Sequence, residues 1–250
     1  MIDGSLITAQ KIIKKFGDHT VLSGLDLEIR KGDFTVVMGT SGSGKSTLLY
    51  CLSGMDEITE GSVLFEGNDI SKMSEIELED IRGSKLGFVF QEANLVSNLT
   101  VRENVMISAF QTVKNKKVAD KRVVKEVDEL LGDMGLSEIM EHFPSEISGG
   151  EAQRAAIARA TIKHPEIMFA DEPTGALNRS NTEEVLNLLI DLNKEGQTIL
   201  MVTHSKEAAL CGNRVIYLED GQIKNEINLY GLSSEEKESR LDAWLKELRW

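Results

Sequence analysis

The chain is predicted to be an α/β protein with a largely parallel sheet, on three observations. Segments rich in β-forming residues alternate with helix-forming segments over much of its 250 residues. A glycine-rich loop, Gly39–Thr47, stands between a β-rich run and a helical run. An apolar run, IMFADE over Ile167–Glu172, ends in two acidic residues, as buried parallel strands do where they reach a binding edge.

The first half of the chain contains three strand-like runs. FTVVMG over Phe34–Gly39 leads into the glycine loop, and Lys45–Leu52 is predicted to be a helix. Strand character returns in Gly61–Ile70 and again in Lys85–Gln91. Helix formers then dominate Thr100–Met140, which predicts a helical insertion from Gln91 to about Phe143 within the α/β pattern.

The second half returns to alternation. Glu166–Pro173 and Thr198–His204 are predicted strands, separated by a helix over Asn181–Leu192. RVIYLEDGQIKNEI, over Arg214–Ile227, is predicted to be a β-hairpin that turns at Asp220–Gly221, because Asp-Gly favours a tight turn.

The composition excludes several classes of protein. A formal net charge of −13, from 28 basic and 41 acidic residues, disfavours nucleic acid as a partner. The two cysteines, Cys51 and Cys211, form no metal-ligand or disulfide pattern, which fits a reducing cytosol. No stretch approaches the roughly 20 apolar residues that span a bilayer, so we expect no direct membrane insertion.

The glycine loop GTSGSGKST matches the pattern G-x-x-x-x-G-K-[ST] of triphosphate-binding loops in full. Glycines let backbone N–H groups point at phosphate oxygens, and the following helix N-terminus adds partial positive charge. Lys45 is predicted to bridge the β- and γ-phosphates, and the Ser46 hydroxyl to ligate Mg²⁺. The alternative is a flexible turn without a ligand. The predicted binding residues of the loop are Gly39, Thr40, Ser41, Gly42, Ser43, Gly44, Lys45, Ser46 and Thr47.

Two carboxylates follow the apolar run at the edge where ligands collect in open α/β sheets. Asp171 is predicted to hold Mg²⁺, directly or through water, and Glu172 to polarise an attacking water. An ordinary strand with acids at its solvent end is the alternative.

His204 and Gln91 also follow predicted strands. We expect His204 to donate a hydrogen bond to the γ-phosphate, and Gln91 to reach Mg²⁺ and the attacking water. The alternatives are a structural histidine and a surface glutamine. Ser205, directly after the histidine, is predicted to cap a helix.

SGGEAQRAAIARA, over Ser148–Ala160, resembles the signature sequence of the ATP-binding-cassette (ABC) ATPases, and the likeness extends over about Leu6–Glu226. It implies a P-loop NTPase fold with a RecA-like core, an antiparallel β-subdomain and an α-helical subdomain. The implied organisation is a cassette over 1–228, with the helical subdomain inserted at about 91–148, followed by a tail over 229–250.

The resemblance also implies how the signature works. Ser148, Gly149, Gly150 and Glu151 would cap the γ-phosphate of an ATP held by the glycine loop of a second copy, so that two subunits close head to tail around two ATP and Mg²⁺. A glycine-capped helix without a ligand is the alternative. Phe16 stands where the family places an aromatic ring, usually Tyr, against adenine; a buried core Phe is the competing interpretation.

Three further residues depart from the family pattern. Ile147 and Glu151 replace the usual Leu and final Gln of the signature, and Asn178 stands where an Asp is usual. Asn178 keeps the hydrogen-bonding shape without the charge. We therefore expect communication between subunits to be weakened or retuned, with activity retained.

GFVFQEANLVSNLTVRENV and FADEPTGAL most resemble the subgroup that contains macrolide exporters, lipoprotein-release systems, the division-associated cassette and bacitracin and lantibiotic detoxification transporters. Among these, the bacitracin and lantibiotic detoxification transporters are most similar to the segment VTHSKEAALCGNRVIYLEDGQI, over Val202–Ile223. The implied function is an ATPase subunit that forms a homodimer in the cytoplasm and drives a separate permease for antimicrobial peptides from the inner face of the membrane. Lipoprotein release and division-type regulation of a membrane partner are alternatives, and a ribosome- or nucleic-acid-acting cassette is disfavoured by the acidity.

The tail carries an apolar stripe at helical spacing. Ser233 and Glu236 form a capping-box pattern, and the stripe that follows comprises Leu241, Trp244, Leu245 and Leu248. We expect it to pack on its own domain or on the twin subunit; a membrane-surface or permease-docking role is the alternative.

Overall fold

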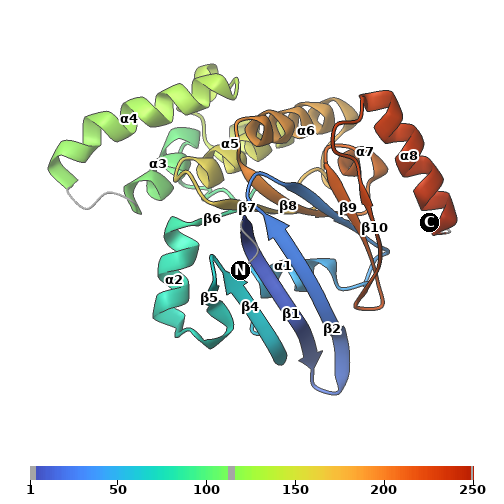
Figure 1. The fold of residues 1–250 in the computed structure, drawn as a ribbon. Helices are drawn as coiled ribbons and strands as arrows, with labels where there is room; N and C mark the ends of the chain where they lie inside the picture. Colours follow the sequence, from blue (N-terminus) through green and yellow to red (C-terminus); the bar gives the residue numbers. More distant parts are fainter. Residues whose placement is uncertain (1–3, 112–115, 249) are drawn as a thin grey trace. The chain divides into compact units, whose positions relative to one another are not determined.

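The computed structural model describes residues 4–111, 116–248 and 250. Contacts divide the chain into two units, which are described separately. Unit 1 comprises Met1–Ser74 and Asn193–Trp250, and unit 2 comprises Glu75–Leu192 (Figure 1).

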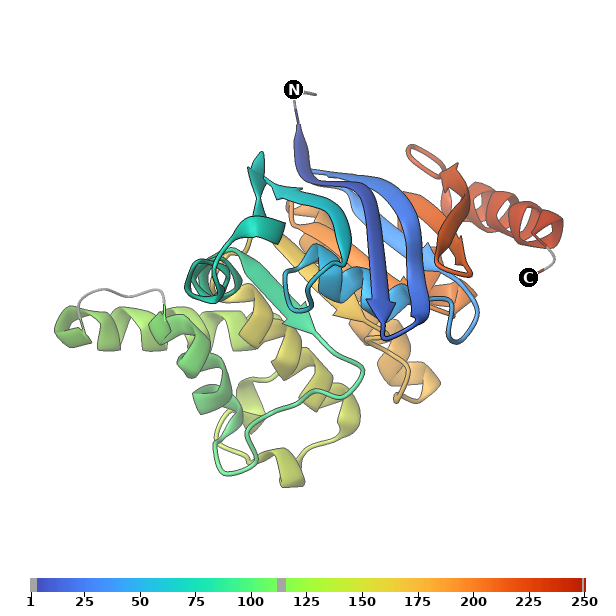
Figure 2. The same ribbon diagram turned by 90° about the horizontal axis from the view of Figure 1, so that it is seen from below.

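The first sheet of unit 1 is antiparallel and has the strand order β2-β1-β4-β5. A long hairpin of β1 and β2 forms one side of it, and both views show the two strands side by side (Figures 1 and 2). β4 pairs with the other edge of β1 and β5 follows after a tight turn. The strands are β1 (Ser5–Phe16), β2 (His19–Arg30), β4 (Glu60–Phe65) and β5 (Asn68–Asp69). The single strand expected over Gly61–Ile70 is therefore a small hairpin followed by a 3₁₀ turn, η1 (Ile70–Lys72).

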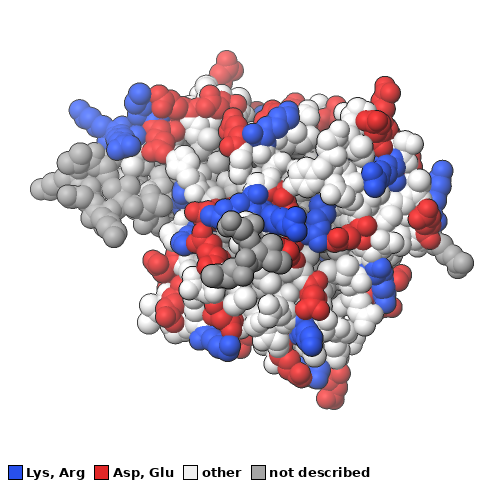
Figure 3. All heavy atoms as spheres, viewed as in Figure 1, with Lys and Arg blue, Asp and Glu red and all other residues white. Residues whose placement is uncertain are grey.

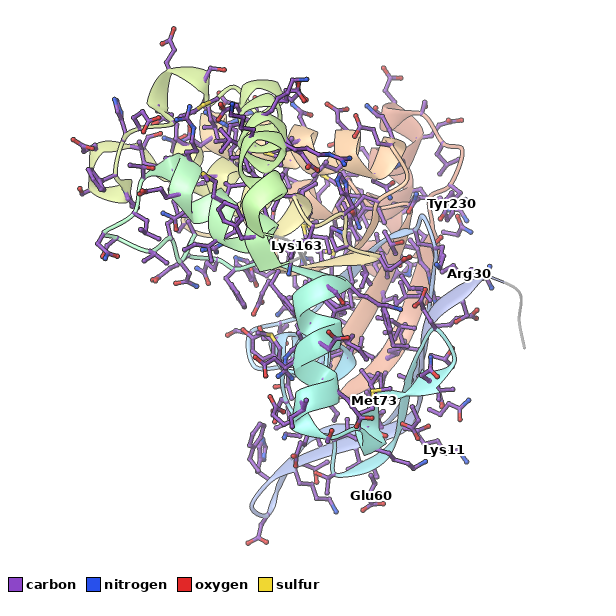
Figure 4. The ribbon with its side chains drawn as sticks, turned by 90° about the vertical axis from the view of Figure 1, so that its left-hand side faces the viewer. Lys11, Arg30, Glu60, Met73, Lys163 and Tyr230 are labelled. Carbon is purple, nitrogen blue, oxygen red and sulfur yellow. The ribbon has the colours of Figure 1, made fainter. Side chains whose placement is uncertain are left out.

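β1 is irregular in its middle. Lys11 has a φ of 48°, and the pairing with β2 shifts register between Ala9 and Ile12. On β4, a Cβ at Gly61 would lie 2.6 Å from the carbonyl oxygens of both Gln10 and Lys11, so the close approach of the two strands requires glycine there. Figure 4 labels Lys11 on β1 and Glu60, the residue before that glycine.

The second group of strands in unit 1 has the order β10-β9-β3-β8. β3 runs parallel to both of its neighbours, and every residue of β3 and β8 is buried. The strands are β3 (Phe34–Met38), β8 (Thr198–Thr203), β9 (Arg214–Glu219) and β10 (Gln222–Asn228). The predicted hairpin is confirmed: Asp220 and Gly221 have φ of 47° and 70°, as a type I′ turn needs.

Beyond β10, Tyr230 ties the chain back to the start of β3. Its hydroxyl donates a hydrogen bond to Asp33, and burial and this carboxylate raise the pKa of the phenol. Figure 4 labels Tyr230 and, on β2, Arg30.

The described residues of unit 1 contain the whole of α1 (Lys45–Leu52), α7 (Lys206–Ala209) and α8 (Ser234–Glu247). α1 has the predicted bounds. α8 begins at the predicted capping box, and its Leu241, Trp244 and Leu245 are buried. The Trp244 ring meets Tyr217 of β9 edge-on, with 6.3 Å between ring centroids. The expectation that the stripe packs on its own domain is confirmed.

Unit 2 contains one parallel strand pair, β6 (Leu86–Val89) and β7 (Ile167–Asp171). Helices occupy much of the stretch where the insertion is expected, and α3 packs against α4 and α5 (Figure 1). The predicted stretch Thr100–Met140 includes residues 112–115, which lie outside the described residues. The helices are α2 (Glu75–Ser84), α3 (Val101–Gln111), α4 (Lys116–Asp133), η2 (Ser137–Ile139), η3 (Pro144–Glu146), α5 (Gly149–Thr161) and α6 (Arg179–Lys194), the last two residues of which fall in unit 1.

α2 was not predicted, and none of its residues is buried. One contact that attaches it to unit 2 comes from Lys163, after α5, whose ammonium donates to the Arg82 carbonyl at 3.3 Å (Figure 4).

Within the described part of the chain, no helix has both the length and the apolar character that a membrane crossing needs. Cys51 and Cys211 are free thiols, as expected, and burial raises the pKa of each to about 12.

Candidate functional site

The glycine loop leaves the end of β3 where the backbone is crowded. A Cβ at Gly39 would lie 2.2 Å from the carbonyl oxygen of Leu218 on β9 and 2.6 Å from Ser43 Oγ. Gly42 and Gly44 have φ of 80° and 100°, which side chains rarely tolerate. The glycines of the motif are therefore required by the fold of the loop itself.

Replacing Gly39 with Ala should destabilise unit 1, because its methyl group meets a backbone oxygen that cannot rotate away. We expect a loss of at least about 2 kcal/mol in the free energy of unfolding, measured by chemical denaturation. Gly83→Ala is the matched control: it lies in α2 with no atom near the added methyl, and should be neutral or stabilising by about 0.5–1 kcal/mol. Equal stability of the two variants would contradict this view of the loop.

The start of α1 is suited to an anion. Gly44 is the N-cap of the helix, and as a glycine it supplies no side chain to cap the first turn. Lys45 is only 8% exposed, and its ammonium donates to the Gly39 and Thr40 carbonyls at 2.8 and 3.0 Å, at the base of the loop. The buried Ser43 hydroxyl has no hydrogen-bond partner. These donors fit a phosphate group, with which they would pair.

His204 follows β8, the strand that lies parallel to β3 with Thr203 opposite Met38. Unit 1 thus places His204 and the glycine loop after neighbouring strand ends. His204 is exposed, and Ser205 caps α7 by accepting from the Ala208 N–H at 3.2 Å, as predicted. The short helix thereby fixes where the strand ends.

Phe16 ends β1 and is 54% exposed, so the interpretation of a buried core Phe is wrong. The ammonium of Lys14 lies 4.6 Å from the ring centroid. Lys14 is itself held by Asp56 Oδ1 at 2.6 Å and the Glu57 carbonyl at 2.7 Å. An exposed, supported ring is able to stack on a flat ligand.

In unit 2, β7 brings Asp171 and Glu172 to its end. Asp171 is 9% exposed, while Glu172 has a φ of 49°, a strained value for a non-glycine residue. The strain belongs to a turn in which the Gly175 N–H donates to the Glu172 carbonyl at 2.9 Å. Gln91, which follows the neighbouring strand β6, packs on this turn: a Cβ at Gly175 would lie 3.1 Å from its Nε2. Unit 2 therefore gathers Gln91 and the two carboxylates at one strand edge.

The signature sequence begins α5 with a capping box. The Glu151 N–H donates to Ser148 Oγ at 3.3 Å. In return, the Ser148 N–H and the Ser148 hydroxyl both donate to Glu151 Oε2, each at 2.7 Å. These two bonds from Ser148 hold the pKa of Glu151 below its ordinary value. The serine and the glutamate predicted to meet a phosphate are bonded to each other here.

The beginning of α5 packs tightly against the beginning of α6. A Cβ at Gly150 would lie 2.5 Å from Cγ of Asn181, so only glycine fits. Asn178 accepts from the Asn181 N–H at 3.0 Å and so caps α6. The expectation that Asn178 keeps the hydrogen-bonding shape of Asp is confirmed; its effect between subunits stays a prediction.

Two residues of α5 that the sequence analysis passed over hold the chain beside Gln91. Gln153 is 1% exposed and donates to the Phe90 carbonyl at 2.7 Å. Arg159 donates to the Ala93 and Asn94 carbonyls at 2.9 and 2.6 Å. The sequence feature that could have identified Gln153 and Arg159 is a polar side chain among the alanines of a helix, because a buried polar group needs a hydrogen-bond partner.

The sequence model of the ABC transporter family matches residues 22–175. The bacitracin export ATP-binding protein BceA of Halalkalibacterium halodurans is 42% identical over 229 residues, which cover 90% of this chain and 89% of BceA. The lipoprotein-releasing system ATP-binding protein LolD of Aquifex aeolicus is 42% identical over 222 residues, or 89% of this chain and 97% of LolD.

Among solved structures, the dimeric post-hydrolysis state of the ATP-binding cassette MJ0796, bound to ADP and Pi, superposes with a TM-score of 0.82 at 37% identity. It covers 90% of this chain and all of the cassette. The expected P-loop NTPase fold is confirmed. The chain belongs to the ABC transporter family and is one of its ATP-hydrolysing, ATP-binding components, in the subgroup of BceA, LolD and the macrolide export ATP-binding/permease protein MacB.

Proposed function

We propose that this chain powers a separate membrane permease for antimicrobial peptides by closing on a second copy around two ATP molecules. The observation that carries the proposal is the anion site at the start of α1, with its buried lysine and unpartnered Ser43 hydroxyl, in a chain that also carries a signature helix. A dimeric relative bound to ADP and Pi supports the closing step.

In this proposal the loop binds the triphosphate. Backbone N–H groups at the start of α1 receive the phosphate oxygens, and Lys45 turns its ammonium from loop carbonyls towards the β- and γ-phosphates. Phe16 stacks on the adenine, backed by the cation of Lys14.

Mg²⁺ would neutralise charge on the β- and γ-phosphates. Ser46, Asp171 and Gln91 would hold it, a hydroxyl, a carboxylate and an amide that supply the oxygen ligands this ion prefers. Burial of Asp171 at the end of β7, with Gln91 packed on the adjoining turn, agrees with this role.

Hydrolysis requires a base beside the attacking water. The Glu172 carboxylate accepts a proton as the water oxygen bonds to the γ-phosphorus and the bond to the ADP oxygen breaks. His204 donates a hydrogen bond to the γ-phosphate and orients the water. Ser148, Gly149 and Gly150 of the second copy cap that phosphate, so that loss of the γ-phosphate removes the contact and reopens the pair.

The membrane partner and the cargo rest on the relatives. BceA is named for bacitracin export and LolD for lipoprotein release, and both match at the same identity. We favour the peptide role because the segment after β8 resembles the detoxification transporters, and keep lipoprotein release as the second candidate.

A position on the cytoplasmic face of the membrane follows from a permease partner. On the face in Figure 3, basic and acidic side chains are interspersed, which agrees with a protein partner and not with nucleic acid.

The test is to identify the membrane permease that co-purifies with the chain, to reconstitute the two in lipid vesicles and to measure ATP hydrolysis with added cargo. We expect bacitracin to stimulate hydrolysis several-fold and a lipidated peptide to have no effect. The reverse pattern assigns lipoprotein release, and stimulation by neither contradicts both candidate cargoes.

A further inference from the structure

The hydroxyl of Ser148 has a single proton, and a carboxylate already holds it. Glu151 Oε2 lies 2.7 Å from Ser148 Oγ and 2.7 Å from the Ser148 nitrogen. Each bond is charge-assisted, a class about twice as strong as neutral hydrogen bonds. The donor that a γ-phosphate would use is therefore engaged within the chain.

A phosphate at this helix end would meet a second difficulty. The carboxylate that holds Ser148 is an anion in the first turn of α5, and a γ-phosphate is also an anion. Two like charges a few ångströms apart repel each other, and more strongly when closure of two subunits excludes water. Glutamine, which the family usually has here, fills the same capping box without the charge.

We propose that Glu151 restrains closure of the dimer, because its carboxylate must release the Ser148 hydroxyl before that serine can cap the γ-phosphate of the other copy. Glu151 is a positioning residue: it sets how tightly ATP holds the pair together, and leaves binding of ATP to a single copy unchanged. The inference rests on the head-to-tail dimer of the proposed function.

The chain contains a matched control for this box. At the start of α8, the N–H and hydroxyl of Ser233 both donate to Glu236 Oε2, each at 2.8 Å, and the Glu236 N–H donates to Ser233 Oγ at 3.3 Å. The pKa of Glu236 is lowered by the same bonds from its serine. Glu236→Gln removes the same charge from the same local geometry on a helix to which no nucleotide role is assigned.

The experiment measures ATP-dependent dimerisation by analytical ultracentrifugation in the full chain carrying Glu172→Gln, which slows hydrolysis. Glu151→Gln and Glu236→Gln are each added to this background. We expect Glu151→Gln to tighten the dimer about tenfold for each of its two sites, or about a hundredfold in the dissociation constant. Glu236→Gln should leave it unchanged, although both substitutions should lower the melting temperature slightly and equally.

The outcomes separate the two claims. If the background variant dimerises with ATP and Glu151→Gln leaves the constant unchanged or weakens it, the restraint by Glu151 is wrong and the head-to-tail dimer stands. An equal effect of Glu236→Gln would also overturn it, since net charge would then be the cause. If no variant dimerises with ATP and Mg²⁺, the dimer and the inference are both overturned.

Discussion

Glu172→Gln should lower ATP hydrolysis by about 10²–10⁴-fold, the usual contribution of a general base, while ATP binding persists. The amide keeps the size of the side chain but cannot accept the proton of the attacking water. Because the γ-phosphate then stays in place, the subunits should remain together, and gel filtration with ATP and Mg²⁺ should show a stable dimer.

Glu247→Gln, at the exposed end of α8, is the control for loss of one negative charge and should hydrolyse ATP at the parental rate. If the Gln variant retained more than about a tenth of the parental rate of ATP hydrolysis, the assignment of Glu172 as the base would be wrong. The strained φ of 49° at this residue is kept by either side chain, so a change of fold would not explain the loss.

Lys45→Ala should raise the dissociation constant for ATP at least about a hundredfold, because each charge-assisted hydrogen bond to phosphate contributes about 1.5–3 kcal/mol. Binding of ATP to the monomer is measured by titration calorimetry without Mg²⁺, so that ATP is not hydrolysed during the titration.

Lys237→Ala is the matched control for Lys45. Lys237 is a partly buried lysine of unit 1 that, like Lys45, donates to a backbone carbonyl, here that of Gly212 at 3.0 Å, and burial lowers its pKa. Its substitution should cost folding stability and leave ATP affinity unchanged. Similar losses of affinity in the two variants would mean that Lys45 acts on the fold and not on the phosphates.

The sequence predicted the strands and helices whose pattern is strong. β3, β7 and β8 consist mostly of apolar residues, and all of their residues are buried. α1 follows a loop with a fixed pattern, and the turn at Asp220–Gly221 has a strong local preference. These are also the elements that carry Lys45, Asp171 and His204, which explains why most of the candidate site could be predicted.

Three elements, β1, β2 and α2, could not be identified from the residue pattern, for physical reasons. The hairpin of β1 and β2 contains register shifts and a left-handed residue at Lys11, which interrupt the two-residue alternation expected of a strand. α2 buries no residue, and its three apolar residues, Ile76, Leu78 and Ile81, are too few to repeat at helical spacing over several turns.

The bond between Ser148 and Glu151 shows a different limit. The pattern Ser-x-x-Glu is the same at Ser148 and at Ser233, and the structure forms the same box at both. Sequence alone does not tell whether the carboxylate bonds to its own serine or faces a ligand, because both use the same atoms.

The central claim is that each ATP is bound by the loop of one copy and capped by the signature of the other. It is tested by mixing a ¹⁵N-labelled Lys45→Ala copy, which should not bind ATP, with an unlabelled Glu172→Gln copy. An ATP analogue with a photoreactive group on its γ-phosphate is then activated, and peptides are identified by mass spectrometry. The account predicts modification of the ¹⁵N-labelled peptide that contains Ser148; modification of only the unlabelled peptide would contradict it.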